Sequence, residues 1–138
     1  MDPTRLRTVT RAHLSWLQWE ALIRSRGITI DRPKHRPHPR YPDIIYPLSY
    51  GYINETISSD GEPVDVFVGT APTGLVGLLH TTDYREADYE SKLLYNCTPT
   101  EIYTVHGFIN YDRTLLEGVL VLRHPMHTLW AAPQESAG

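Results

Sequence analysis

The strongest constraint on the fold is a proline-rich segment at residues 32–42. It reads RPKHRPHPRYP and holds four of the eleven prolines of the chain. Proline fixes φ and removes a backbone donor, so neither a helix nor a central strand can cross this segment. Its cationic side chains are Arg32, Lys34, Arg36 and Arg40. We interpret the segment either as a solvated loop or as a stiff arm that presents cations to an anion.

Length and composition indicate one ordinary domain over residues 1–138. The chain has 138 residues, 41% of them hydrophobic, which suits a single domain with a modest core. The formal net charge of −3 gives no global basic field that would attract nucleic acid or a membrane surface. The single cysteine, Cys97, cannot form an internal disulfide, and no apolar run approaches the ~20 residues of a membrane helix. We therefore predict a cytoplasmic protein without nucleic-acid or membrane partners.

Two helices are predicted. Over residues 9–26, apolar side chains recur every three or four positions, and Gly27 stands where a helix would end. A second helix is predicted near residues 99–109, because TPTE at 98–101 is a capping box with proline at the first helical position. The apolar N-terminal helix packs either on its own sheet or against a second subunit of a homo-oligomer. The tail at residues 131–138 is expected to be disordered.

Short β-branched and apolar runs, separated by turn signals, predict the strands. They lie at residues 28–31, 44–53, 64–70, 74–83, 92–97 and 118–123, and an acidic loop is expected at 84–91. Five or six short strands with a helix at each end favour an α+β domain. We expect it to be built on a small twisted or barrel-like sheet.

Three carboxylates stand at the entrance of one predicted strand. The stretch DGEPVDVFVG at residues 60–69 contains Asp60, Glu62 and Asp65. The first two suit a turn that faces water. Asp65 lies inside the strand, where an aspartate is disfavoured, and a buried carboxylate needs a cation, a metal or several donors. The stretch is therefore either a polar turn with one paired acid or part of a metal site.

A second acidic cluster precedes Lys92. It consists of Asp83, Glu86, Asp88 and Glu90. Carboxylates from two segments, without histidine or cysteine at a ligand spacing, suit a hard cation such as Mg²⁺. We interpret the seven histidines as structural or solvated and Cys97 as a core residue. Carboxylates, tyrosines and a cationic arm together favour phosphoryl chemistry, in which cations neutralise phosphate oxygens.

Residues 46–70, YPLSYGYINETISSDGEPVDVFVGT, resemble the soluble family I inorganic pyrophosphatases. The hallmark of that family is a tyrosine-rich strand, a short spacer and an acidic stretch of the form D-G-D-P-x-D-V. A weaker similarity continues at residues 88–94, DYESKLL. The resemblance implies a five-stranded OB-like barrel, dependence on Mg²⁺, and hydrolysis of pyrophosphate to two phosphates.

The resemblance also implies roles for individual residues. Metal ligands would be Asp60, Asp65 and Glu90, with Asp88 as the candidate for a further ligand and Asp83 or Glu86 as alternatives. The base that orients and deprotonates the attacking water would be Glu62. Phosphate contacts would come from Lys92, Tyr50 and Tyr46, and from arm cations among Arg32, Lys34, Arg36 and Arg40.

The sequence departs from the family pattern in its acids and at both ends. Glu62 and Glu90 stand where the family has aspartates, and a shift of about 1 Å in a catalytic group can cost on the order of 10²-fold in rate. The N-terminal hairpin of the family is shortened into the proline arm, and its C-terminal helix has no room. Three hypotheses remain: a Mg²⁺-dependent pyrophosphatase, a hydrolase of another phosphoanhydride such as a nucleotide, and an inactive relative that binds phosphate or a protein.

Overall fold

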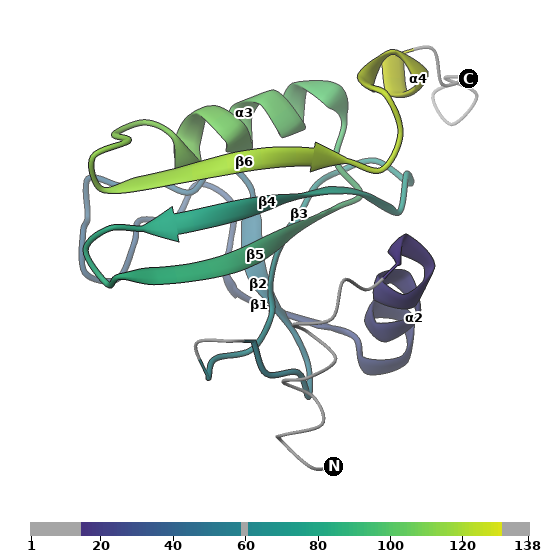
Figure 1. The fold of residues 1–138 in the computed structure, drawn as a ribbon, viewed down its shortest axis with the longest axis horizontal. Helices are drawn as coiled ribbons and strands as arrows, with labels where there is room; N and C mark the ends of the chain where they lie inside the picture. Colours follow the sequence, from purple (N-terminus) through teal and green to yellow (C-terminus); the bar gives the residue numbers. More distant parts are fainter. Residues whose placement is uncertain (1–14, 59–60, 131–138) are drawn as a thin grey trace.

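The computed structural model describes residues 15–58 and 61–130, which form an α+β domain on one six-stranded sheet (Figure 1). The helices are α2 (Trp16–Arg26), α3 (Pro99–Ile109) and α4 (Met126–Trp130). The strands are β1 (Ile28–Arg32), β2 (Ser49–Ile53), β3 (Asp65–Val68), β4 (Leu75–Asp83), β5 (Asp88–Tyr95) and β6 (Leu116–Leu122). Their order across the sheet is β1-β2-β3-β5-β4-β6.

The sheet is mixed, and its one parallel pair brings two distant segments together. Strands β3 and β5 run parallel, while the other neighbouring strands pair antiparallel. In the parallel pair, Asp65 is the register partner of Lys92. The connection between these strands is the antiparallel strand β4, which lies on the far side of β5. The sheet therefore sets the acidic stretch beside the Lys-Leu strand.

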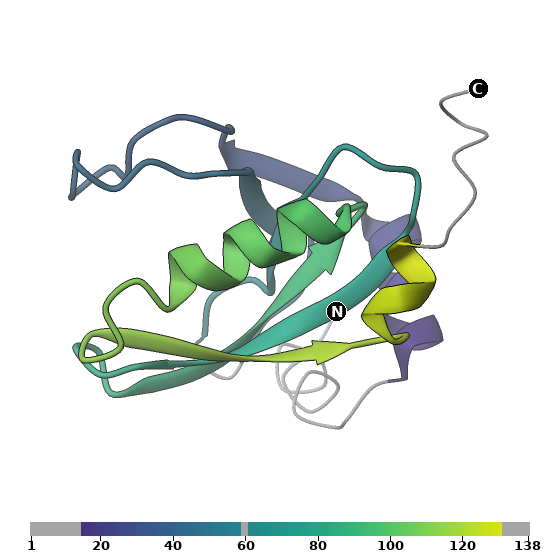
Figure 2. The same ribbon diagram turned by 90° about the horizontal axis from the view of Figure 1, so that it is seen from above.

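The core has two halves, one on each face of the sheet. Helix α3 covers one face and α2 packs at the other (Figure 2). Successive residues of a strand point to opposite faces, so Leu78 and Leu93 pack with α2 while Leu79 and Leu94 pack with α3. The apolar runs at residues 75–79 of β4 and 93–94 of β5 follow from this two-sided burial.

The α+β class is confirmed, but the strands that the structure describes form an open sheet rather than a closed barrel. The two edges are β1 and β6, at opposite ends of the strand order, and they do not pair with each other. Closure requires hydrogen bonds between the first and last strands. The resemblance implied a barrel of five strands, whereas six are present in this open arrangement.

Capping boxes fix where the two longer helices begin. Helix α3 spans Pro99–Ile109 as predicted, because the Thr98 hydroxyl accepts from the backbone N–H of Glu101 at 3.1 Å. Helix α2 begins at Trp16, not as part of one continuous helix from residue 9. Ser15 has an extended backbone and caps the helix through Gln18, which ends any helical run there. Residues 9–14 and the predicted tail at 131–138 lie outside the described residues.

Other element boundaries also differ from the sequence prediction, and two of them lie near the proline arm and the acidic segment. Residues 44–48 are not part of β2, which begins at Ser49, because Pro47 cannot donate to a strand ladder. The expected acidic loop is shorter, because residues 88–91 pair with β4 and extend β5. The short helix α4 was not predicted. Among the described residues, no helix is long and apolar enough to cross a membrane.

A glycine in β2 gives a direct test of the sheet. A Cβ added at Gly51 would overlap the carbonyl oxygen of Thr29 in β1 and lie 2.9 Å from the Cα of Ile30. We expect Gly51→Ala to lower the free energy of unfolding by about 2–3 kcal/mol, because backbone atoms must move to accept the methyl group. Urea unfolding followed by circular dichroism measures this change.

The matched control is Gly107→Ala in α3. No atom lies within 4 Å of a Cβ at that position, and alanine is a better helix former than glycine by about 1 kcal/mol. This variant should therefore be more stable than the wild type. Equal urea midpoints for both variants and the wild type would contradict the close approach of β1 and β2.

Candidate active site

The centre of the candidate site is a buried lysine between two carboxylates. The ammonium Nζ of Lys92 lies 3.0 Å from Asp65 Oδ2, donates to Glu90 Oε1, and donates to Tyr50 Oη at 2.8 Å. Lys92 is only 8% exposed. An ammonium group has three donors, and here each donor has an oxygen partner. We call these four residues the Lys92 cluster.

The sheet positions every member of the Lys92 cluster. Asp65 and Lys92 are register partners across β3 and β5. Glu90 stands two residues before Lys92, so both side chains leave β5 on the same face. Tyr50 comes from β2, where it lies opposite Phe67 of β3. Three strands therefore contribute to one point, although the chain positions involved are up to 42 residues apart.

Electrostatics keep Lys92 charged and Tyr50 neutral. Burial alone would lower the pKa of Lys92, but the adjacent Tyr50, Asp65 and Glu90 outweigh it and hold that pKa well above its usual value. Burial raises the pKa of the Tyr50 phenol. At neutral pH the cluster therefore contains an ammonium ion beside a protonated phenol.

A second cation lies against the same aromatic wall. Arg32 donates to the hydroxyl of Tyr46, and its guanidinium carbon lies 5.3 Å from the Tyr46 ring centre and 5.6 Å from that of Tyr50. His38 stacks on Tyr46 with 6.1 Å between ring centres. Burial and then the charges of nearby arginines lower the pKa of His38, which favours a neutral imidazole. Arg32 and Lys92 thus flank a pair of tyrosine rings.

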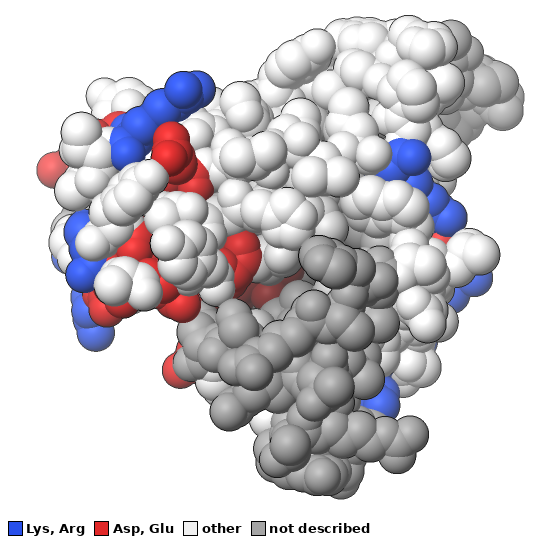
Figure 3. Space-filling view, viewed as in Figure 1, with Lys and Arg blue, Asp and Glu red and all other residues white. Residues whose placement is uncertain are grey.

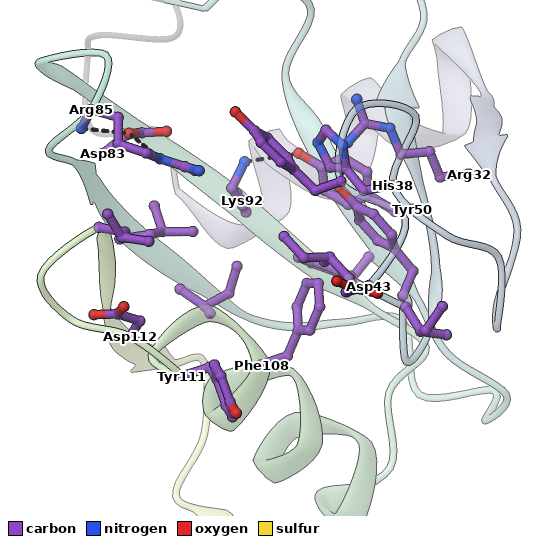
Figure 4. Close-up of a pocket in the computed structure, with 18 of the residues that line it drawn as sticks. Arg32, His38, Asp43, Tyr50, Asp83, Arg85, Lys92, Phe108, Tyr111 and Asp112 are labelled. Carbon is purple, nitrogen blue, oxygen red and sulfur yellow. Dashed lines mark hydrogen bonds and ion pairs between the residues drawn. The ribbon is translucent and has the colours of Figure 1, made fainter.

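A cavity of about 680 Å³ opens beside these groups (Figure 4). Its permanent cations are Arg32, Arg85 and Lys92, and its carboxylates are Asp43, Asp83, Asp88, Glu90 and Asp112. Acidic side chains therefore outnumber permanent cations in the lining, five to three. Figure 3 shows acidic and basic side chains gathered at one end of the sheet, around the β4–β5 turn.

The structure brings together eight of the residues singled out from the sequence. Asp65 belongs to the Lys92 cluster, and the others line the cavity: Arg32, Tyr46, Tyr50, Asp83, Asp88, Glu90 and Lys92. Five others among the described residues do not line it, namely Lys34, Arg36, Arg40, Glu62 and Glu86. Lys34 and Arg40 are exposed on the proline arm, and Glu62 is exposed in the turn before β3. Asp60 lies outside the described residues.

Several lining residues had no signal in the sequence. Arg85, in the β4–β5 turn, lies 5.5 Å from the ring centre of Tyr41 on the proline arm and 3.7 Å from Asp83. Phe108, near the end of α3, packs against Tyr46 with 5.3 Å between ring centres. The contacts of Arg85 with Tyr41 and of Phe108 with Tyr46 join segments that lie far apart in the chain. No local pattern marks them, and only the folded arrangement of arm, turn and helix reveals them.

The carboxylates of the Lys92 cluster could supply two ligands to Mg²⁺, but not a complete set of protein ligands. Within residues 15–58 and 61–130, no group of three or more histidine, cysteine, aspartate or glutamate side chains could hold a metal ion. Mg²⁺ in enzymes is often held by only one or two carboxylates together with substrate phosphates. Asp65 and Glu90 converge on one cation, which here is the ammonium of Lys92. These two carboxylates are enough for a Mg²⁺ ion that is held partly by substrate phosphates.

A comparison with known families matches the region that carries this site. The family model of inorganic pyrophosphatase matches residues 30–95, which include part of β1, all of β2, β3, β4 and β5, and every member of the Lys92 cluster. Over these residues the chain is similar to the inorganic pyrophosphatases. The matched residues also include the proline arm, so the pyrophosphatase similarity extends to the wall that carries Arg32.

Individual pyrophosphatases match only part of their own length. An inorganic pyrophosphatase of Escherichia coli is 45% identical over 60 residues, which are 37% of this chain and 33% of that protein. One of Buchnera aphidicola is 36% identical over 73 residues, 53% of this chain and 32% of that protein. The chain therefore spans about a third of the length of these curated relatives.

A solved inorganic pyrophosphatase from Helicobacter pylori shares the fold. It superposes with a TM-score of 0.53 over 80% of this chain and 92% of that chain, at 18% sequence identity. The structural similarity thus reaches beyond the residues that align in sequence.

Proposed function

We propose that the chain hydrolyses pyrophosphate to two phosphates with the help of Mg²⁺. The observation that carries the proposal is the Lys92 cluster at the wall of a cavity, because it combines a cation suited to phosphate oxygens with two carboxylates that converge on one point. The relation to inorganic pyrophosphatases supports the same reaction. Pyrophosphate is the substrate in this proposal.

The charge of the cavity lining supports a requirement for a divalent cation. Five carboxylates and three permanent cations line the cavity, and Asp65 adds a further carboxylate at the Lys92 cluster. A highly anionic pyrophosphate would meet net repulsion there. Asp65 and Glu90 would hold Mg²⁺, with Asp60 and Asp88 as further candidates. When bound, Mg²⁺ neutralises phosphate oxygens and lowers the pKa of a coordinated water.

The side chains of the cluster would bind and orient the phosphates. The ammonium of Lys92 and the guanidinium of Arg32 attract phosphate oxygens, and the neutral phenol of Tyr50 can donate a further hydrogen bond. The rings of Tyr46, Tyr50 and Phe67 form an apolar wall behind these groups, which strengthens electrostatic interactions by excluding water. Glu62, which the resemblance implies as the base, does not line the cavity and has no role in this proposal.

One observation favours a second candidate function, that of an inactive phosphate-binding relative. The ammonium of Lys92 already stands at the point where Asp65 and Glu90 converge. A lysine that keeps this position would bind a phosphate without giving way to a metal. Binding of phosphate without turnover is the result that this candidate predicts.

The test measures phosphate release from pyrophosphate by the full chain, with MgCl₂ and then with EDTA in excess. We expect release above the protein-free background with Mg²⁺, and a return to background with EDTA. Absence of release in both conditions would remove the hydrolase proposal. Isothermal titration with inorganic phosphate would then decide whether the inactive relative remains.

The cytoplasmic location expected from the sequence stays part of this proposal.

Cys97 is proposed to be a core residue without a catalytic role. Burial, followed by the charge of Glu101, raises the pKa of Cys97 to about 12. Such a thiol is a core group and not a nucleophile. Assembly into a homo-oligomer stays a prediction.

A further inference from the structure

The cavity offers more room than a pyrophosphate ion uses. Its volume of about 680 Å³ falls among those of sites that hold drug-sized ligands, about 300–1,000 Å³. Two phosphoryl groups beside Lys92 and Arg32 would occupy the charged part alone. The remaining part is lined by two carboxylates, Asp43 and Asp112, and by many apolar side chains: Ile44, Ile45, Phe108, Ile109, Leu115 and Leu116.

The basic side chains and the aromatic side chains of α3 lie apart in the cavity. In Figure 4, Arg32, Arg85 and Lys92 occupy one side, and Phe108 and Tyr111 lie away from them, on the side that also carries Asp43 and Asp112. A bare pyrophosphate has no surface that would gain from contact with these aromatic side chains. Their place in the cavity therefore requires an explanation beyond pyrophosphate binding.

Large apolar side chains stay exposed around this cavity. Four of them line it: Tyr41 with 44% of its surface exposed, Ile45 with 48%, Leu115 with 40% and Tyr111 with 92%. They come from the proline arm and from the turn after α3. Exposed apolar side chains that gather at a concave site are typical of ligand-binding grooves. We call these four residues the apolar rim.

We propose that this site also accepts, as a second substrate beside pyrophosphate, a diphosphate ester with a planar organic group, the chemistry of a nucleoside diphosphate. This inference rests on the proposed phosphoanhydride hydrolysis and names its substrate class. The two phosphates would lie at Lys92 and Arg32, and the organic group would lie on the apolar rim. Continuity of the charged and apolar parts within one cavity favours a single ligand with both characters.

Aromatic geometry favours a planar group. The ring of His38, on the proline arm, lies 5.0 Å from the ring of Tyr41 and 6.1 Å from the ring of Tyr46, measured between centres. Arg85 lies over the Tyr41 ring at 5.5 Å. Guanidinium planes and aromatic rings are the surfaces on which nucleobases stack.

The reaction on such a substrate balances without any further reactant. The oxygen of water bonds to the terminal phosphorus, and the bond from that phosphorus to the bridging oxygen breaks. The bridging oxygen stays with the organic monophosphate. One proton passes to the solvent, and the products are an organic monophosphate and inorganic phosphate.

The test compares kcat/KM for phosphate release from pyrophosphate, ADP and methyl diphosphate, each with Mg²⁺. We expect ADP to exceed methyl diphosphate by about tenfold, as one stacked base contributes. Tyr111→Ala and Tyr41→Ala should each lower the ratio of the ADP value to the pyrophosphate value by about five- to tenfold. Tyr103→Ala is the matched control, since Tyr103 is 56% exposed on α3 and does not line the cavity.

The outcomes distinguish failure of the organic-diphosphate inference from failure of the pyrophosphatase proposal. Cleavage of pyrophosphate without cleavage of ADP would overturn the organic-diphosphate inference and leave the pyrophosphatase proposal intact. Equal values for ADP and methyl diphosphate would overturn it as well, because the organic group would then contribute nothing. A ratio that Tyr111→Ala and Tyr41→Ala leave unchanged would show that ADP binds away from the apolar rim. Cleavage of none of the three compounds would overturn both proposals.

Discussion

Asp65→Asn is expected to lower kcat/KM for pyrophosphate hydrolysis by about 10²–10³-fold, the usual cost of removing one preorganised charged group. The substitution keeps the shape of the side chain and removes its charge. Asp65 Oδ2 now accepts from Lys92 at 3.0 Å, and with Glu90 it is the proposed holder of Mg²⁺. An amide binds a hard divalent cation much more weakly than a carboxylate does. Initial rates at limiting pyrophosphate, and at one fixed Mg²⁺ concentration that does not saturate the variant, measure the effect.

The control for this substitution is Asp31→Asn. Asp31 is exposed on β1 and does not line the cavity, so the same chemical change there should leave the rate within about twofold, as expected of a surface substitution. Circular dichroism and urea midpoints establish that both variants are folded. If Asp65→Asn kept more than a tenth of the wild-type rate, the Asp65 carboxylate would not be part of the catalytic site.

Local chemistry made part of the fold predictable. The capping box at residues 98–101 fixed the start of α3, because its hydrogen bonds involve only neighbouring residues. The prolines of residues 32–42 likewise predicted that the arm is neither helix nor central strand, because proline restricts its own backbone and that of the preceding residue. The start of β5 was missed, because residues 88–91 gain strand structure from pairing with β4 and not from their own apolar pattern. The open sheet was missed as well, since strand order depends on long-range pairing.

In the candidate site too, residues marked by local chemistry could be predicted, and residues brought in by long-range contacts could not. Asp65 could be singled out because an aspartate within a β-branched strand needs a partner. Its convergence with Glu90 and Lys92 was an expectation from a family resemblance, and the parallel pairing of β3 with β5 provides the physical cause. Arg85 could not be found in this way. Its contact with Tyr41 depends on how the β4–β5 turn meets the proline arm.

Lys92→Met should produce the largest loss of stability among single substitutions in the site. Methionine preserves most of the side-chain length but leaves the carboxylates of Asp65 and Glu90 without their shared cation. Removing one partner of a buried ion pair costs about 3–5 kcal/mol. We expect about 3 kcal/mol, the lower end, because these two carboxylates keep 20% and 17% of their side-chain surface exposed. Urea unfolding at pH 7 measures the loss.

A combined variant separates the charge effect from lost packing. If unpaired carboxylates cause the loss, then Lys92→Met/Asp65→Asn/Glu90→Gln should be more stable than Lys92→Met alone, because it removes both buried charges together with the cation. Lys34→Met controls for the loss of an exposed lysine on the arm and should shift the free energy of unfolding by less than about 0.5 kcal/mol. A triple variant as unstable as Lys92→Met would assign the loss to the hydrogen bond with Tyr50 and to the different packing of methionine. The pairing of Lys92 with the two carboxylates would then not be the source of the lost stability.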